Sequence, residues 1–326
     1  MTTPARPRPA LAGPGLDRAA DERSEDGLLD RLRADAATRV LVVHGDAAPL
    51  TSASGSASAS TSASTRAPGA NGGKQHPALL LVSPDQVRDA SEWAFLGRDA
   101  EGTAVLSAVL PSEAPAPFDA PGGWAGLRVV GGDLAPGEAG MFVEALSLGR
   151  WLLDAPYCPA CGTRTEVRGA GWSRHCPACG REHFPRTDPA VIVAVTSAVD
   201  PDRLLLGSNA AWGQNRFSCF AGFAEAGESL ESAVVREVRE EAGVEVSDLT
   251  YRGSQAWPYP RSLMLGFFAT ALDDSAARAD GDEIAEVRWF TRDEIGEALA
   301  GGGDVLLPGK ASIAHRLIAD WQAGGA

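Results

Sequence analysis

The chain has 326 residues, of which 44% are hydrophobic and 22% charged, as in an ordinary globular protein of two or three domains. Its formal net charge of −14 argues against a general nucleic-acid binder, because affinity for phosphates comes mostly from Lys and Arg. No apolar run approaches the roughly 18–20 residues that span a bilayer, and residues 1–15 lack the apolar core of a secretory signal. We therefore expect a cytoplasmic protein.

The N-terminal part, residues 1–154, has short apolar runs separated by Gly and Pro, which predict a β-rich domain. Residues 51–73 are almost entirely Ser, Ala, Thr and Gly, and we expect a disordered insertion because they can bury little apolar surface. The apolar runs on either side, at 38–45 and 78–83, would then be neighbouring strands of one domain. Further strands are predicted at 93–97, 104–110 and 126–132, and an amphipathic helix at 137–156.

Residues 155–184 carry two Cys-x₂-Cys pairs, formed by Cys158, Cys161, Cys176 and Cys179. Each pair lets two thiolates bind one ion, and two pairs complete a tetrahedral site. Because four thiolates leave no position open for water, we predict a structural Zn²⁺ in a zinc ribbon. His175 and His183 flank the cysteines; we expect them to be exposed and not to bind the ion, with replacement of a cysteine ligand as the alternative. A ribbon of this kind can bind nucleic acid or only hold two domains together, and the spacing does not distinguish these roles.

The C-terminal part, residues 185–326, mixes predicted strands and helices, so the whole chain is expected to be an α+β protein. Strands are predicted at 190–199, 203–208, 263–272 and 286–290, and helices at 229–243 and 309–322. Cys219 lies in the apolar run 217–223, which is typical of a buried strand. Since no histidine is near it in the sequence, we expect an inert core thiol rather than a nucleophile.

The helix predicted at 229–243 lies within a longer stretch, 222–244, that fits the pattern Gly-x₅-Glu-x₇-Arg-Glu-U-x-Glu-Glu-x-Gly-U, where U is a bulky aliphatic residue. At about 100° per residue, Glu237, Glu240 and Glu241 share one face of this helix. Carboxylates this close repel one another, and divalent cations such as Mg²⁺, which prefer oxygen ligands, relieve the repulsion. We therefore predict a metal-binding face. For the helix taken alone, a solvated acidic face with neighbouring arginines is the alternative.

This stretch resembles the signature box of the Nudix hydrolases. The resemblance implies an α/β/α sandwich that hydrolyses a nucleoside diphosphate linked to another group, with Mg²⁺ or Mn²⁺ held by a loop–helix–loop. By position, the implied catalytic and metal-site residues are Glu237, Glu240, Glu241 and the carbonyl of Ala221, with Glu240 as a ligand or a helper of the base. Arg236 and Glu228 would pair to brace the loop.

Residues 254–262, SQAWPYPRS, follow the box by ten residues and alternate aromatic residues with prolines. Because proline fixes φ and lacks an N–H, we expect a stiff loop here rather than a helix or a central strand. Together with the upstream cysteines, the stretch resembles the S-Q-P-W-P-F-P-x-S signature of the NADH pyrophosphatase subfamily, with Ala256 and Tyr259 as departures. The resemblance implies cleavage of NAD(H) to NMN(H) and AMP, removal of NAD caps from RNA 5′ ends in some members, and homodimers whose sites draw on both subunits.

The same resemblance implies further site residues and leaves two other functions open. The implied substrate-binding residues are Phe184, Phe223, Gln255, Ala256, Trp257, Pro258, Tyr259, Pro260, Arg261, Ser262 and Ala314. Glu283 is implied as one more ligand of the Mg²⁺ or Mn²⁺. One alternative is a pyrophosphatase for ADP-ribose or another dinucleotide. The other is a zinc-ribbon module that binds nucleotides without cleaving them, which the complete set of box glutamates disfavours.

Overall fold

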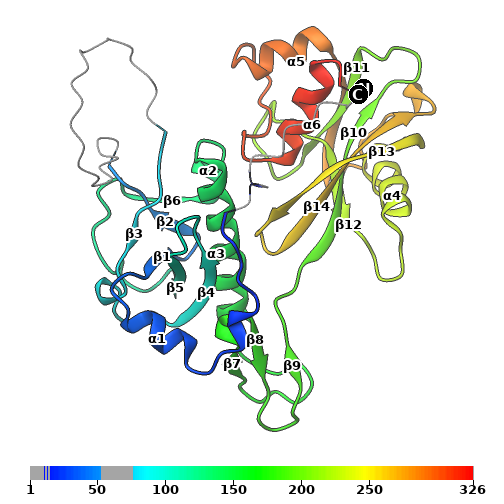
Figure 1. The fold of residues 1–326 in the computed structure, drawn as a ribbon. Helices are drawn as coiled ribbons and strands as arrows, with labels where there is room; N and C mark the ends of the chain where they lie inside the picture. Colours follow the sequence, from blue (N-terminus) through cyan, green and yellow to red (C-terminus); the bar gives the residue numbers. More distant parts are fainter. Residues whose placement is uncertain (1–10, 12, 14, 53–75, 326) are drawn as a thin grey trace, which may run out of the picture. The chain divides into compact units, whose positions relative to one another are not determined.

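The computed structural model describes residues 11, 13, 15–52 and 76–325 of the chain. They fall into two compact units, one within residues 15–185 and one of residues 186–325 together with residues 11 and 13. Figure 1 shows the elements of both units along the chain. The disordered insertion predicted at 51–73 lies outside the described residues from residue 53 onward. No helix of the described residues is long and apolar enough to cross a membrane.

The N-terminal unit contains a sheet with the strand order β4-β5-β1-β2-β6, in which β3 also pairs with β1. Its strands are β1 (Arg39–His44), β2 (Ala47–Pro49), β3 (Leu81–Val82), β4 (Glu92–Arg98), β5 (Ala104–Leu110) and β6 (Trp124–Gly126). Because β1 and β3 are antiparallel partners, the prediction that the runs at 38–45 and 78–83 are neighbours is confirmed. Alternate residues of β1, Val40 and Val42, are buried in the same core as Leu106 of β5.

The helices of this unit cover and extend the sheet. They are η1 (Glu22–Ser24), α1 (Leu28–Ala34), η2 (Pro84–Gln86), α2 (Leu127–Val130) and α3 (Pro136–Asp154). The helix predicted at 137–156 is confirmed as α3, which packs against β1, β4 and β5. The strand predicted at 126–132 is wrong, because Leu127 and Val130 are buried three residues apart, which suits one helical turn rather than a strand.

The four cysteines lie in turns beside a small sheet of the same unit, with the order β7-β8-β9. Its elements are β7 (Glu166–Arg168), η3 (Gly169–Gly171), β8 (Ser173–His175) and β9 (Glu182–His183). Arg174 of β8 is 1% exposed and donates to the Leu152 carbonyl of α3 at 2.5 Å and to Glu92 of β4 at 3.0 Å. The Trp172 indole N–H donates to the Phe95 carbonyl at 2.7 Å. These bonds fasten the ribbon to the N-terminal sheet.

The C-terminal unit is built on a second sheet, with the order β13-β14-β10-β11-β15 and with β12 paired to β10. Its strands are β10 (Asp188–Thr196), β11 (Arg203–Asn209), β12 (Phe220–Phe223), β13 (Val246–Trp257), β14 (Ser262–Ala271) and β15 (Ile284–Thr291). The pairs predicted from the apolar runs at 190–199 and 203–208 are confirmed as antiparallel β10 and β11. The helices are α4 (Leu230–Ala242), η4 (Asp274–Ala276), α5 (Arg292–Leu299) and α6 (Ile313–Gln322).

The apolar run of β10 has no polar alternation because helices cover both faces of the sheet. Val191 and Val193 are buried in one core with Val234 of α4. Ile192 and Ala194 are buried in the other core, with Leu317 and neighbouring residues of α6. Figure 1 shows α4 and α6 on opposite sides of the strands. This is the α/β/α sandwich that the resemblance implied.

The helix predicted at 229–243 begins and ends as its sequence predicts. The Ser229 hydroxyl accepts from the Ser232 N–H at 3.1 Å, which caps the first turn of α4. Gly243 ends the helix with a φ of 68°, a left-handed conformation that glycine adopts without steric cost.

The stretch 254–262 is a hairpin, so the prediction of a loop over its whole length is wrong. Residues 254–257 are the end of β13, residues 258–261 form the turn, and β14 begins at Ser262. Trp257 pairs with Ser262 across the hairpin. Both prolines fall in the turn, where the missing N–H removes no hydrogen bond of the sheet. The strand β13 was not predicted because its residues lack a regular apolar alternation.

Candidate active site

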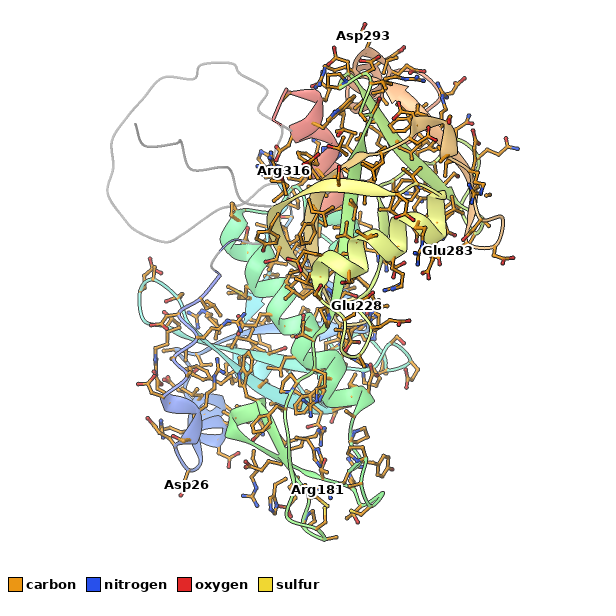
Figure 2. All side chains as sticks on the ribbon, turned by 90° about the vertical axis from the view of Figure 1, so that its right-hand side faces the viewer. Asp26, Arg181, Glu228, Glu283, Asp293 and Arg316 are labelled. Atoms are coloured by element: carbon orange, nitrogen blue, oxygen red, sulfur yellow. The ribbon has the colours of Figure 1, made fainter. Side chains whose placement is uncertain are left out.

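Arg236 of α4 joins the loop before the helix to the acidic face of the helix. Its Nε and Nη2 donate to the two carboxylate oxygens of Glu228, each at 2.9 Å, and Nη2 also donates to the Phe223 carbonyl. Its Nη1 donates to Glu237 at 2.8 Å and to Glu240 at 3.1 Å. The bonds from Arg236 hold the pKa of Glu228 at about 2, so this pair stays charged. The predicted pairing of Arg236 with Glu228 is confirmed, and Figure 2 shows Glu228 beside the start of α4.

Gly222 of β12 makes room for the carboxylate of Glu237. A Cβ atom at position 222 would lie 2.0 Å from Cδ and Oε1 of Glu237, far inside van der Waals contact. Glu237 is 9% exposed, and burial raises its pKa against the opposing effect of Arg236. The fixed glycine of the box therefore has a packing reason: it lets a partly buried carboxylate lie against the backbone of β12.

Glu241 is the most buried glutamate of the box, at 5% exposed. Its Oε2 accepts from the backbone N–H of Ala221 at 3.3 Å, which joins α4 to β12. Burial, followed by the negative charges of Glu283 and Glu237, raises the pKa of Glu241 to about 8. Burial is the larger cause of this shift, and the charges of Glu283 and Glu237 add to it, so the carboxylate of Glu241 lies within reach of two other negative groups. A divalent cation bound among them would offset these charges.

Glu283 reaches this group from a loop before β15, far from α4 in the sequence (Figure 2). Oδ1 of Asp280 accepts the backbone N–H groups of Asp282, Glu283 and Ile284 at 2.9, 3.1 and 2.9 Å, which fixes the course of this loop. On the other side, the Glu283 carbonyl accepts from the Ala210 N–H at 2.8 Å. Glu283 is therefore held by its backbone from two directions while its side chain stays exposed.

A cavity of about 190 Å³ opens beside these carboxylates. The predicted site residues that line it are Ala221, Glu241, Gln255, Trp257, Glu283 and Ala314. They come from β12, α4, β13, the loop before β15 and α6, so the fold collects them from separate parts of the sequence. Cys219 also lines the cavity, and burial raises the pKa of its thiol to about 12, in agreement with the prediction of an inert thiol.

Gln255 is the residue of the 254–262 hairpin that is best placed to bind a polar group. It is 1% exposed, and its Nε2 donates to the Ala311 carbonyl at 2.6 Å, just before α6. Its Oε1 is buried and has no hydrogen-bond partner among the described residues. A buried acceptor without a partner carries a free-energy cost of about 1–3 kcal/mol, which a ligand N–H or O–H would remove.

Most other residues of the hairpin do not line the cavity. Those outside the lining are Ala256, Pro258, Tyr259, Pro260, Arg261 and Ser262. Arg261 pairs with Asp188 at 2.9 Å, at the start of β10. Tyr259 makes a T-shaped contact with Trp257, with ring centroids 5.2 Å apart, and so packs behind the residue that does line the cavity. These residues shape the hairpin, and their substrate contacts stay predictions.

The two predicted phenylalanines are both about half exposed, at 51%. Phe223 ends β12, next to the box glycine, and its carbonyl is bonded to Arg236, so its position is fixed relative to α4. Phe184 belongs to the N-terminal unit and follows the ribbon. Neither ring lines the cavity. Both are open to a ligand, and their predicted substrate contacts stay predictions.

The sequence analysis missed four polar or aromatic residues that line the cavity: Asn209, Trp212, Ser218 and Ser312. Asn209 ends β11, and its Nδ2 lies 3.5 Å from Oε1 of Glu283. The only signal in the sequence was position, because Ser218 precedes β12 by two residues and Ser312 caps α6. Trp212 lies in a polar, Gly-containing segment without periodicity, which gave no signal.

The four cysteines form a compact set in the ribbon of the N-terminal unit. Their sulfur atoms all lie within 4.8 Å of one another, with 3.7 Å between Cys158 and Cys179 and 3.5 Å between Cys161 and Cys176. Tetrahedral Zn–S bonds of about 2.3 Å place sulfur atoms about 3.8 Å apart. Within the described ranges, no other group of three or more Cys, His, Asp or Glu side chains is as compact, and neither histidine joins this one.

The two cysteine pairs have the same backbone geometry. In the first, the Gly162 N–H donates to the Cys158 carbonyl at 2.8 Å; in the second, the Gly180 N–H donates to the Cys176 carbonyl at 2.9 Å. Both glycines have a φ of 73°, which allows the chain to turn tightly after each pair. His175 and His183 are half-buried in β8 and β9 rather than exposed. The ribbon thus presents four thiols and a closed tetrahedral arrangement that suits Zn²⁺.

Comparison with known families matches the sandwich and the cysteine ribbon to two separate family descriptions. Residues 186–308 match the NUDIX domain, and residues 154–184 match the NADH pyrophosphatase zinc ribbon domain. The first match covers the sandwich with its glutamate helix, and the second covers the cysteine ribbon.

Curated relatives extend the similarity beyond single domains. The chain is 43% identical over 242 residues to the NAD-capped RNA hydrolase NudC of Mycobacterium tuberculosis, an alignment that covers 71% of this chain and 76% of the relative. It is 38% identical over 196 residues to the human NAD-capped RNA hydrolase NUDT12, covering 56% of this chain and 42% of the relative. The chain therefore belongs to the Nudix hydrolases, in the subfamily that carries the NADH pyrophosphatase zinc ribbon.

Proposed function

We propose that this hydrolase cleaves the pyrophosphate of NAD(H) with water to give NMN(H) and AMP. One observation carries the proposal: a single cavity brings box and loop carboxylates, Glu241 and Glu283, together with Gln255 and Trp257 of the hairpin. With a divalent cation between them, the carboxylates suit the negatively charged pyrophosphate of a dinucleotide, and the hairpin residues suit a flat or polar group at one end of it. The relatives named above, NAD-capped RNA hydrolases, support the same substrate class.

The glutamates fit a divalent metal by their chemistry. Mg²⁺ or Mn²⁺ would be held by Glu237, Glu241, Glu283 and the Ala221 carbonyl, with Glu240 as a further ligand or a helper of the base. When bound, the metal would neutralise the phosphates and lower the pKa of the attacking water. The oxygen donors match what Mg²⁺ prefers, and the charges of Glu283 and Glu237 beside Glu241, which add to burial in raising its pKa, support a positive charge at this place.

The chain's own residues then position the reacting groups. Arg236 holds Glu237 and Glu240 toward one side of α4, and Gly222 lets Glu237 lie close to β12. Among the box carboxylates that are bonded to Arg236, that of Glu240 is the most exposed, with 54% of its side chain accessible to solvent. We assign Glu240 the role of metal ligand or helper of the base. Gln255 offers its free oxygen to a donor on the substrate.

The test is a product assay with purified protein. With Mg²⁺ or Mn²⁺ present, NAD(H) should yield NMN(H) and AMP in equal amounts, and chelation of the metal should stop the reaction. Absence of both products at high enzyme concentration would refute the proposal. Measuring kcat/KM on NADH, ADP-ribose and diadenosine polyphosphates separates NAD(H) hydrolysis from the alternative of a broader dinucleotide pyrophosphatase.

NAD-capped RNA is the second candidate substrate, because the curated relatives are named for that activity. The net charge of −14 favours the small dinucleotide, since RNA phosphates bind mainly to Lys and Arg. Parallel kinetics on NADH and on an NAD-capped RNA oligonucleotide would rank the two. We also propose a cytoplasmic homodimer: free cysteines in the ribbon suit a reducing compartment, and light scattering would test the dimer.

A further inference from the structure

Trp212 is an aromatic residue of the cavity that neither the glutamate box nor the 254–262 hairpin contains. It lies in the segment between β11 and β12 and lines the same cavity as Glu241, Glu283 and Trp257. Its side chain is 41% exposed, which is unusual for a tryptophan because the large ring is costly to leave in water. An exposed indole at the wall of a site offers a flat surface to a ligand.

The backbone on the N-terminal side of Trp212 is fixed to the metal-site loop. The Trp212 N–H donates to the Asn209 carbonyl at 2.9 Å, and the Ala211 N–H donates to Oδ1 of Asn209 at 2.9 Å. The N–H of Ala210, which lies between Asn209 and Ala211, donates to the Glu283 carbonyl at 2.8 Å. The backbone that carries the indole is therefore fixed relative to Glu283, which is one of the proposed metal ligands.

The other end of the segment is also held. The Leu306 N–H donates to the Asn215 carbonyl at 2.8 Å, and the Phe217 N–H donates to the Leu306 carbonyl at 3.0 Å. The guanidinium of Arg216 lies 6.0 Å from the Trp212 ring, on the segment between these two bonds. Since both ends are bonded to the domain, little ordering entropy is lost when a ligand contacts the indole.

Gln255 lines the same cavity, and its buried Oε1 has no partner among the described residues. A ligand that satisfied both features would have a flat ring for Trp212 and an N–H group for Gln255. The two ends of NAD(H) both have this chemistry, since nicotinamide carries a carboxamide and adenine an amine. The terminal ribose of ADP-ribose has neither a flat ring nor an N–H.

We propose that Trp212 is a substrate-positioning residue that stacks on a nitrogenous ring of the dinucleotide while the ring's N–H donates to Gln255. This rests on the proposed function and adds to it a determinant of which substrates bind well. Stacking of a base on an aromatic side chain changes affinity by about 10- to 100-fold when the side chain is truncated to alanine. Trp212 touches no reacting phosphate atom, so its effect is expected in KM rather than in kcat.

The test compares Trp212→Ala and Trp212→Phe with the wild type on NADH and ADP-ribose. Trp212→Ala should raise KM for NADH about 10- to 100-fold with kcat within about 3-fold, and Trp212→Phe should restore most of the affinity because it keeps a flat ring. The matched control is Tyr251→Ala, which removes another exposed aromatic of the same unit, 52% exposed and outside the cavity. It should leave both constants unchanged.

The outcomes separate the possible rings. A loss on NADH but not on ADP-ribose places nicotinamide on Trp212, and an equal loss on both places adenine there. Unchanged KM on both substrates, or an equal loss for Trp212→Phe and Trp212→Ala, overturns the stacking. If the wild type does not cleave NADH, the proposed function fails separately. Calorimetric titration of wild type and Trp212→Ala with NMN and with AMP then decides. If Trp212→Ala binds either ligand more weakly than the wild type does, stacking is supported. If the two proteins bind each ligand equally, stacking is overturned.

Discussion

The ribbon and the sandwich each carry four side chains suited to a metal, and the chain arranges them in opposite ways. The four cysteine sulfur atoms lie within 4.8 Å of one another, on two turns with the same backbone bonds. The four glutamates come from α4 and from the loop before β15, and no three of their described carboxylates are gathered as tightly. Two of them, Glu237 and Glu240, are bonded to Arg236 instead.

This difference follows from what each site has to do. A closed thiolate set has no position for water, so it suits an ion that stays in place and stabilises the fold. A spread set of carboxylates beside a cavity leaves coordination positions for substrate and water, and the charges of Glu283 and Glu237 add to burial in raising the pKa of Glu241. The first set should therefore matter for folding and the second for turnover, and three substitutions test that division.

The largest effect is expected from Cys176→Ser in the ribbon. Cys176 is fully buried, and loss of one ligand should lower the zinc content from one ion per chain to almost none. Zinc binding supplies about 10 kcal/mol or more of folding free energy in small zinc domains, so the N-terminal unit should unfold at a lower temperature. Metal analysis and calorimetry would measure both. The control is Cys219→Ser, a substitution outside the ribbon, which should leave the ribbon zinc in place. If Cys176→Ser also retains the zinc, the site is misassigned.

Glu241→Gln should have the largest effect on turnover and little effect on folding. The amide keeps the size of the side chain and the acceptor for the Ala221 N–H, but it lacks the charge that binds a metal. We expect kcat on NADH to fall about 10³-fold. The thermal midpoint should stay the same or rise, because the substitution removes a buried group whose charge is costly.

The control for this variant is Glu231→Gln, an exposed glutamate in the first turn of the same helix. It should retain kcat within about 2-fold, since helix-end charges contribute only a few tenths of a kcal/mol. Should Glu241→Gln keep more than a tenth of the wild-type activity, the metal site does not include Glu241, and the comparison of the two metal sets loses its basis.

Gly222→Ala tests whether the open set depends on packing as well as on charge. The added Cβ would lie 2.0 Å from the Glu237 carboxylate, so Glu237 must move away from β12. A displacement of about 1 Å in a catalytic group costs about 10²-fold in rate, which is the expected fall in kcat. Gly309→Ala, whose Cβ meets no atom within 4 Å, should be silent. Equal rates for the two variants would show that Glu237 has no fixed role.

Much of the fold was readable from the sequence because local rules and tertiary packing agree there. β10 is a continuous apolar run because both faces are covered, and α4 has a serine cap, a glycine end and an apolar side that packs on the sheet. The four-residue helix α2 was mistaken for a strand, since one helical turn and a short strand leave nearly the same apolar pattern.

The site was only partly readable, since its second half depends on strand pairing. Asn209 and Glu283 meet because β11 pairs with β15, with Asn209 opposite Ile284, a register that no local pattern specifies. The position of the Trp212 backbone beside Glu283 follows from the same pairing. The role of Gly222 is visible only when Glu237 is placed beside it. The pairing of Arg261 with Asp188 was likewise not visible in the sequence, and the predicted contact of Arg261 with substrate stays a prediction.

The smallest expected effect concerns a buried carboxylate that has no part in either metal set. Glu144 of α3 has a side chain that is 5% exposed, and its Oε2 lies 3.7 Å from Nε of Arg18. Burial raises the pKa of Glu144 to about 7 although Arg18 and Arg23 oppose the shift. It is thus the counterpart of Glu241 with arginines in place of carboxylates as neighbours, and it shows what burial does without a metal site.

Because the folded pKa of Glu144 exceeds its unfolded value of 4.5, this group's contribution to stability is complete below pH 4.5 and is lost as the pH rises through 7. Each pKa unit corresponds to about 1.4 kcal/mol, so the N-terminal unit should lose about 2 kcal/mol between pH 5 and pH 7 through this group. The free energy of unfolding, measured in urea at pH 5 and at pH 7, should not show this loss in Glu144→Gln. Asp154→Asn, at an exposed end of α3, should show the same loss as the wild type. Identical losses for Glu144→Gln and wild type would mean that the Arg18 contact outweighs burial, and burial alone would then not account for the raised pKa of Glu241 either.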